Sequence, residues 1–255
     1  MDKAFTTVEI GSKICHVCQY DSRADGSVCH KRPIFYWGID SRNKKRIMTT
    51  MSCLESRLKE KPLDAGFLIV AYESEKWNDD FSPWKAQAAF GNDGFGGNAD
   101  RTLEWLVNQC IPYIEAEDSV YIKNDTKVQR YTVGYSLAGL FGLWAYAECR
   151  LFAGAASCSG SLWYAGWPAY AEEHQAAFCR NKTDCIYLSL GDKEERAKNS
   201  LLSTVGDNTR KLYDMLRALP SGAKTTLEWN AGGHFCEPDI RVARGIYWIL
   251  SSSGV

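Results

Sequence analysis

Residues 128–139, Val128-Gln129-Arg130-Tyr131-Thr132-Val133-Gly134-Tyr135-Ser136-Leu137-Ala138-Gly139, decide the fold because they join a strand to a helix through a serine. β-Branched and aromatic residues alternate with polar ones over 128–133, which predicts a strand. Apolar residues at helical spacing predict a helix over 137–149. The small residues around the corner permit a sharp turn with Ser136 at φ > 0. Such a turn exposes the serine hydroxyl and aims the Leu137 N–H at the space above it.

A base is needed before this turn can be assigned a chemical role, because the motif alone also fits an ordinary strand-to-helix turn. His234 follows a strand-like run over 225–229 and a pair of glycines, which is a favourable position for a base on a loop. The other three histidines, His16, His30 and His174, lack this strand-to-loop setting. His234 is therefore the candidate general base.

An acid that orients the histidine is expected after another buried strand. The run 185–190 predicts that strand, and three carboxylates in four residues follow its terminal Gly191. The offset from this glycine favours Glu194 as the acid. Asp192 and Glu195 remain open as alternatives, and at least two of the three carboxylates belong to a solvated loop.

The second backbone donor of an oxyanion hole is expected after an earlier central strand. A nearly continuous apolar run begins at Pro33 and predicts a strand covered on both faces. Gly38 would let the backbone approach a substrate, so the Ile39 N–H, with Gly38 as neighbour, is the candidate donor beside Leu137. Gly38 fits equally well as the simple end of a buried strand.

Several further motifs resemble those of one enzyme family. They are Tyr36-Trp37-Gly38, residues 77–84, 94–97, the serine turn, 159–163, 190–195 and 232–235, which together span most of residues 33–250. The chain resembles the putative-esterase branch of the α/β-hydrolases, which includes esterase D-like enzymes and siderophore esterases. Ala138 departs from the family pattern, which usually has glycine there.

This resemblance implies a fold and a reaction. The fold would be an α/β-hydrolase fold, with a mostly parallel central sheet and helices on both faces. The order of Ser136, Glu194 and His234 along the chain is the order of that superfamily. The reaction would be hydrolysis of a carboxylic ester through an acyl-serine intermediate. Three alternatives stay open: an acyltransferase, a peptidase, and a non-catalytic binding protein on the same fold.

An aromatic, glycine-rich insertion is predicted over residues 74–98. It follows a sheet strand, where loops commonly line binding pockets. Trp77 and Trp84 from this insertion, with Trp163 from the segment after the strand at 152–157, are the candidate substrate-binding residues. The alternative is that these tryptophans pack the insertion onto the domain.

The alternation of strands and helices predicts one catalytic domain over residues 1–255. An N-terminal hairpin is expected within 1–32. The other expected elements are helices at 45–59, 99–114, 204–219 and 240–251 and strands at 66–73, 152–157, 185–190 and 225–229. No element is defined over 160–182.

Composition limits the partners. Lys+Arg 30 against Asp+Glu 31 gives a formal net charge of −1, so we expect neither nucleic acid nor membrane as a partner. This balance suits a small neutral substrate, and the resemblance implies that this small molecule is an ester. The N-terminus has no apolar signal core, which predicts a cytoplasmic protein, and a homo-oligomer stays open.

The chain has ten cysteines, of which Cys15 and Cys18 have the spacing of a metal or disulfide motif. In a strand these two thiols would point to opposite faces, so we expect neither a metal nor any other cofactor. Cys236 lies two residues from His234, but a nucleophilic cysteine there would leave the serine turn without a role.

Overall fold

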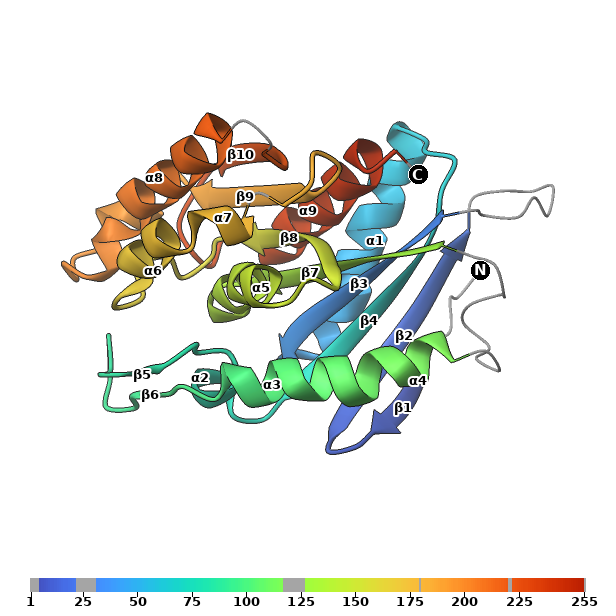
Figure 1. Ribbon diagram of the computed structural model, residues 1–255, viewed down its shortest axis with the longest axis horizontal. Coiled ribbons are helices and arrows are strands. Elements are labelled where there is room, and N and C mark those ends of the chain that lie inside the picture. Colours follow the sequence, from blue (N-terminus) through green and yellow to red (C-terminus); the bar gives the residue numbers. More distant parts are fainter. Residues whose placement is uncertain (1–4, 22–30, 117–126, 179, 220–221, 255) are drawn as a thin grey trace.

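The computed structural model describes residues 5–21, 31–116, 127–178, 180–219 and 222–254, and its centre is an eight-stranded sheet (Figure 1). Its strands, in spatial order, are β1 (Thr6–Ile10), β2 (Lys13–Asp21), β4 (Gly66–Ser74), β3 (Lys31–Asp40), β7 (Lys127–Tyr135), β8 (Phe152–Cys158), β9 (Cys185–Gly191) and β10 (Lys224–Asn230). β2 pairs antiparallel with both β1 and β4, and all other pairs are parallel. The predicted mostly parallel sheet is confirmed.

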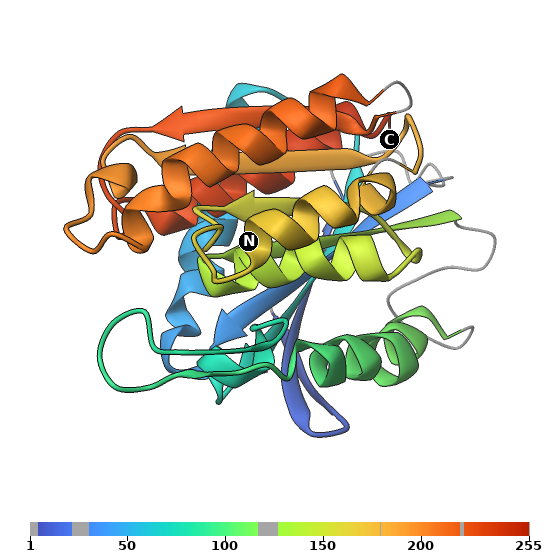
Figure 2. The same cartoon turned by 60° about the vertical axis from the view of Figure 1, so that its left-hand side comes forward.

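Helices cover both faces of this sheet, as the sequence predicts. In Figure 1, α1 (Lys45–Glu60) and α9 (Pro238–Ser252) lie behind the sheet, while α3 (Ala99–Trp105), α4 (Ile111–Glu115) and α5 (Leu137–Glu148) lie in front. Figure 2 shows α8 (Val205–Ala218) on the same side as α5, with α6 (Trp167–Glu173) and α7 (Gln175–Phe178) between them. Buried apolar side chains form two clusters, and each cluster fills the space between one face and its helices.

Two regions differ from the sequence expectation. The single helix predicted over 99–114 contains a π-helical stretch, Leu106–Cys110, between α3 and α4. Pro112 in the first turn of α4 explains the interruption, because proline cannot donate the helical hydrogen bond of its position. The undefined segment 160–182 contains α6 and α7.

The N-terminal hairpin is formed by β1 and β2, within the described part of residues 1–32. Cys15 and Cys18 both lie on β2, and each belongs to a different apolar cluster on opposite faces of the sheet, as strand geometry requires. Both are free thiols. Cys29, His30 and Cys179 lie outside the described residues.

The carboxyl ends of the parallel strands lie at one edge of the sheet, which is where loops can carry a site. Short elements continue the chain there: α2 (Trp77–Asp80) with the small hairpin β5 (Lys85–Ala86) and β6 (Phe95–Gly96) after β4, and the 3₁₀ turns Ser41–Asn43 after β3 and Glu194–Arg196 and Leu202–Thr204 after β9. Within the described residues, no helix is both long and apolar enough to cross a bilayer.

Candidate active site

The serine turn between β7 and α5 is held in a strained conformation. Ser136 has φ 59° and ψ −124°, as the surrounding small residues predict. A Cβ on Gly134 would lie 2.1 Å from the carbonyl of Ala138, so only glycine fits there. The carbonyl of Ser136 accepts hydrogen bonds from the N–H groups of Gly139, Leu140 and Ser161. These bonds fix the backbone and leave the serine hydroxyl free to point into the cleft.

Three side chains predicted from distant parts of the sequence come together at this turn. The Oγ of Ser136 lies 3.0 Å from Nε2 of His234, and Nδ1 of His234 lies 2.7 Å from Oε2 of Glu194. Since an ionised carboxylate only accepts hydrogen bonds, Nδ1 carries the imidazole proton. Nε2 of the neutral ring is therefore the acceptor that faces the serine hydroxyl.

The two alternative acids point elsewhere. Asp192 accepts a hydrogen bond from the backbone N–H of Gly232 at 2.8 Å, which ties the β9 loop to the histidine loop. Glu195 forms an ion pair with Arg210 on α8 at 2.7 Å. Among the three carboxylates after β9, Glu194 is the one that contacts His234.

Glu194 is buried, with only 4% of its side chain exposed, yet it is richly hydrogen-bonded. Its Oε1 accepts from the backbone N–H of Gly191 and from the Ser159 hydroxyl, each at 2.8 Å. Burial raises the pKa of Glu194, but the hydrogen bonds from His234, Gly191 and Ser159 outweigh burial and hold the pKa below its ordinary value of 4.5. The carboxylate is therefore ionised at neutral pH.

Comparison with known families assigns the chain. A model of the family described as Putative esterase matches residues 28–223, which is most of the chain. The chain belongs to the putative esterase family. The protein is accordingly a carboxylic ester hydrolase of the serine hydrolase type. Among curated proteins, no sequence matches this esterase.

Solved structures show the fold of the esterase. The siderophore hydrolase EstA from Aspergillus nidulans has a TM-score of 0.75 at 16% identity, over 99% of this chain and 95% of that one. An IroE-like serine hydrolase from Shewanella oneidensis has a TM-score of 0.74 at 17% identity, over 97% and 80% of the chains. The enterobactin and salmochelin hydrolase IroE has a TM-score of 0.62 at 18% identity, over 99% and 95%. The chain has the α/β-hydrolase fold.

Arg241, which sequence reasoning missed, completes the polar core of the esterase site. This side chain on α9 is 1% exposed, and its Nη1 donates to Oε1 of Glu194 and to Oγ of Ser159, each at 2.8 Å. Nη2 donates to the carbonyls of Ala231 and Gly233 in the histidine loop. One guanidinium thus links the acid to the loop that carries the base.

Two sequence signals could have revealed this arginine. Arg241 lies four residues before Gly245 and eight before Ile249, so helical spacing places its charge on the buried face of α9. The second signal is Gly191 at the end of β9. A Cβ there would lie 2.3 Å from the carbonyl of Gly232 and 2.9 Å from Nη2 of Arg241, so this glycine makes room for the network.

The histidine loop has a further anchor in the strand that carries the serine. The hydroxyl of Tyr135 donates to the backbone carbonyl of His234. Burial raises the pKa of Tyr135 to about 12, so the phenol keeps its proton at neutral pH and serves as a donor. The residue next to the serine therefore also positions the histidine.

The candidate oxyanion donors lie beside Ser136, and Gly38 has an additional structural role. The Leu137 N–H is at the first position of α5, where an α-helix offers no internal acceptor. Gly38 and Ile39 line the cleft next to Ser136 and His234. A Cβ on Gly38 would lie 2.6 Å from the ring of Phe81, which is fully buried, so glycine is required there to admit this ring.

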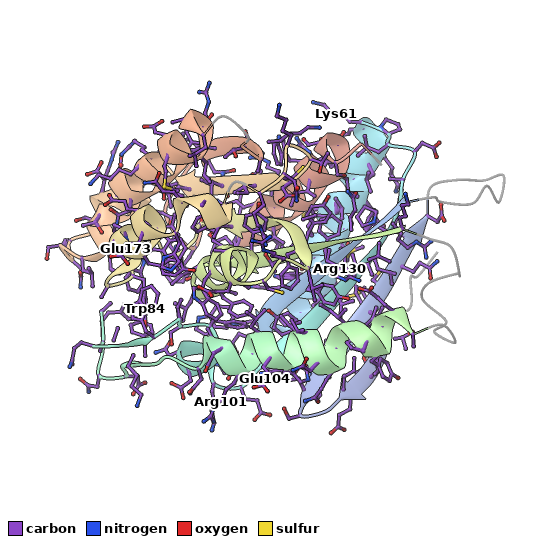
Figure 3. The ribbon with its side chains drawn as sticks, in the orientation of Figure 1. Lys61, Trp84, Arg101, Glu104, Arg130 and Glu173 are labelled. Atoms are coloured by element: carbon purple, nitrogen blue, oxygen red, sulfur yellow. The ribbon has the colours of Figure 1, made fainter. Side chains whose placement is uncertain are left out.

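The tryptophans of the aromatic insertion divide into two groups. Trp77 and Trp163 line a hollow beside Ser136. Trp84 is not among the described residues that line the cleft. Its indole N–H donates to the Ala165 carbonyl at 2.7 Å, and its ring packs against Tyr164 and Tyr170 between the β5–β6 segment and α6 (Figure 3). Trp84 therefore has a packing role, and its contact with a substrate stays a prediction.

Acidification is expected to destabilise the esterase through Glu194. Because the pKa of Glu194 is lower in the folded state than its ordinary value of 4.5, its stabilising contribution is present above that value and is lost as the pH falls toward the folded-state pKa. Between about pH 5 and pH 3, the free energy of unfolding should fall more steeply for wild type than for Glu194→Gln. Urea unfolding at a series of pH values measures both slopes, and equal slopes would contradict the assignment.

Proposed function

We propose that this esterase acts as one catalytic domain that cleaves its ester through a covalent intermediate on Ser136, with His234 as general base and Glu194 as orienting acid. The observation that carries the proposal is the continuous chain of hydrogen bonds from Ser136 to His234 at 3.0 Å and on to Glu194 at 2.7 Å. The 3.0 Å distance lies within the range that proton transfer between nucleophile and base requires, and the 2.7 Å distance lets the acid orient the base.

The first half of the reaction forms the acyl-enzyme. His234 Nε2 removes the proton from Ser136 as Oγ attacks the ester carbonyl, and the carbonyl oxygen becomes an oxyanion. The imidazolium is stabilised by the ionised Glu194, which keeps its own charge throughout. His234 then gives its proton to the departing alcohol, so the C–O bond to the alcohol breaks and the acyl group stays on Oγ.

The second half repeats these steps with water. His234 removes a proton from a water molecule, the resulting hydroxide attacks the acyl carbon, and the proton returns to Ser136 as the acid is released. In both halves the oxyanion would be stabilised by the Leu137 and Ile39 N–H groups. The start of α5 adds a favourable dipole, because the positive end of the helix points to the developing charge.

A covalent probe tests the nucleophile directly. A fluorophosphonate with a short alkyl chain should label wild type stoichiometrically, Ser136→Ala not at all, and His234→Ala much more slowly than wild type, because the unassisted hydroxyl is a weak nucleophile. Intact-mass spectrometry measures the adduct.

Cys236 provides the matched control for this experiment, because it is an exposed thiol two residues from His234. Cys236→Ser should be labelled like wild type. Failure of wild type to react, or labelling that survives in Ser136→Ala and disappears in Cys236→Ser, would exclude the proposed nucleophile.

We place the protein in the cytoplasm. Eight cysteines of the described residues are free thiols, and five of them are buried. Thiols of this kind are typical of proteins that work in a reducing compartment. Fractionation of the source cells tests the assignment, and recovery in an extracytoplasmic fraction would contradict it.

A further inference from the structure

Two hollows of unequal size meet at the candidate nucleophile. The smaller has a volume of about 190 Å³ and the larger about 520 Å³. Ser136 and His234 line both of them, so the boundary between the hollows is the place where an ester carbonyl must lie to be attacked. An ester has one substituent on its carbonyl carbon and one on its bridging oxygen. One substituent must therefore extend into each hollow.

The larger hollow is suited to a bulky apolar group. Its wall is mainly aromatic and aliphatic: Phe90, Phe95, Leu137, Trp163, Leu202 and Val205. The rings of Phe95 and Trp163 are in contact, with centroids 6.0 Å apart, which gives this wall a fixed shape. Its volume lies within the range of about 300–1,000 Å³ that small-molecule sites occupy.

The smaller hollow differs in both size and polarity. Asp40, Asn43, Arg46 and Asp239 contribute polar groups to its wall beside apolar ones such as Trp37, Ile39 and Val242, and its volume is below the usual range for a small-molecule site. It can therefore hold only a small substituent, to which these four side chains offer hydrogen bonds.

Each charged group of the smaller hollow has a neighbour of opposite charge. Arg46 lies 4.0 Å from Asp239. Asp40 forms an ion pair at 2.7 Å with Arg42, which lines the larger hollow. The hydrogen bond from Arg42 is the main reason that the pKa of Asp40 lies below its ordinary value, so Asp40 stays ionised and bound to Arg42. Because Asp40 is paired with Arg42 and Asp239 faces Arg46, the smaller hollow favours neither a positive nor a negative substituent.

We propose that the substrate is an ester that joins one bulky apolar group to one small, neutral, hydrogen-bonding group. This inference rests on the proposed function, because it places the ester carbonyl at Ser136. The bulky group occupies the hollow bounded by Phe95 and Trp163, and the small group occupies the hollow bounded by Asn43 and Arg46. The unequal volumes disfavour esters whose halves are both bulky or both small.

A panel of four esters tests the pairing of the two halves. Hydroxyethyl phenylbutyrate and phenylbutyl glycolate each combine a bulky apolar half with a small polar one, in opposite orientations. Phenylbutyl phenylbutyrate and hydroxyethyl glycolate are the matched controls with two bulky or two small halves. We expect kcat/KM for at least one mixed ester to exceed both controls by about tenfold or more.

A pair of adjacent leucines tests the larger hollow. Leu202 lines it, whereas Leu201 is 36% exposed and is not among its lining residues. Leu202→Trp should lower kcat/KM for the preferred mixed ester by about tenfold. Leu201→Trp, the same substitution one residue away, should leave it unchanged.

Labelling by the short-chain fluorophosphonate is measured on the same samples, so that the two proposals can fail separately. Loss of labelling would overturn the proposed function. A protein that is labelled but cleaves either control as well as both mixed esters would overturn only the substrate inference. A labelled protein that cleaves neither mixed ester, or a Leu202→Trp variant with unchanged kcat/KM for the preferred mixed ester, would overturn it as well.

Discussion

Ser136→Ala is expected to lower kcat by roughly 10⁴ to 10⁶ while the fold stays intact. The substitution removes only the attacking oxygen, and alanine takes a position whose φ of 59° is as unfavourable for alanine as for serine. His234→Ala should have an effect of similar size, because the two residues act as one unit. Hydrolysis of an activated aryl ester, together with thermal unfolding of the same samples, measures the outcome.

Ser161 offers a matched control for Ser136. Its hydroxyl lies 3.4 Å from the Ser136 hydroxyl, it is equally small, and it is almost fully buried. Its structural contribution to the turn is a backbone N–H bond to the Ser136 carbonyl, which alanine preserves. Ser161→Ala should therefore keep kcat within about tenfold of wild type. The reverse result, an active Ser136→Ala and an inactive Ser161→Ala, would show that Ser161 and not Ser136 is the nucleophile.

Glu194→Gln is expected to lower kcat by roughly 10² to 10⁴. Glutamine is isosteric, but it removes the charge that stabilises the imidazolium and can present an N–H group to Nδ1 in place of an acceptor. Asp192→Asn and Glu195→Gln should change kcat much less, because neither side chain contacts His234. If one of these two variants is the more damaging, Glu194 is not the acid.

The same carboxylate is expected to show strong coupling with Arg241. Loss of one partner leaves the other charge buried and uncompensated, so Glu194→Gln and Arg241→Met should each destabilise the fold by about 3–5 kcal/mol. The double variant should lose much less stability than the sum of the two single losses. Its activity should nevertheless stay low, because the acid is still missing.

Chemical denaturation of the four proteins measures this coupling. Stability losses that simply add would mean that the 2.8 Å contact between Arg241 and Glu194 carries no net interaction. A double variant that regains activity would show that Glu194 acts on the reaction only by balancing the buried guanidinium.

The strongly patterned parts of the fold were predictable from local sequence. The strand and helix around Ser136 were predicted from periodicity, and their observed ends, β7 at Tyr135 and α5 from Leu137, differ from the prediction by at most two residues. The positive φ of Ser136 was predictable because Gly134 and Gly139 have no side chains, which leaves room for a sharp turn at the serine between them. The interruption between α3 and α4 was not recognised, although Pro112 is its visible cause in the sequence.

The site was less predictable where it depends on contacts across the fold. Glu194 and His234 lie at the ends of neighbouring parallel strands, so chain order and strand ends were enough to nominate them. Arg241 reaches them from α9, and its helical spacing to Gly245 and Ile249 predicts a buried charge but does not say which residues that charge contacts. The position of Trp84 in a loop after a sheet strand fits both an indole that lines a cleft and one that packs the insertion onto the domain, and sequence alone does not distinguish the two.

The bracing of the histidine loop by Tyr135 and Arg241 has a consequence for how this esterase can diversify. The groups proposed for the chemistry are tied to the central sheet or to α9. Phe90, which is exposed, and Leu202, which is only partly buried, form an outer part of the wall of the larger hollow. Mutations that reshape this outer wall can therefore accumulate without disturbing the reaction. Laboratory evolution aimed at this wall should yield new selectivities at a much lower rate of inactive variants than random mutagenesis of the whole chain.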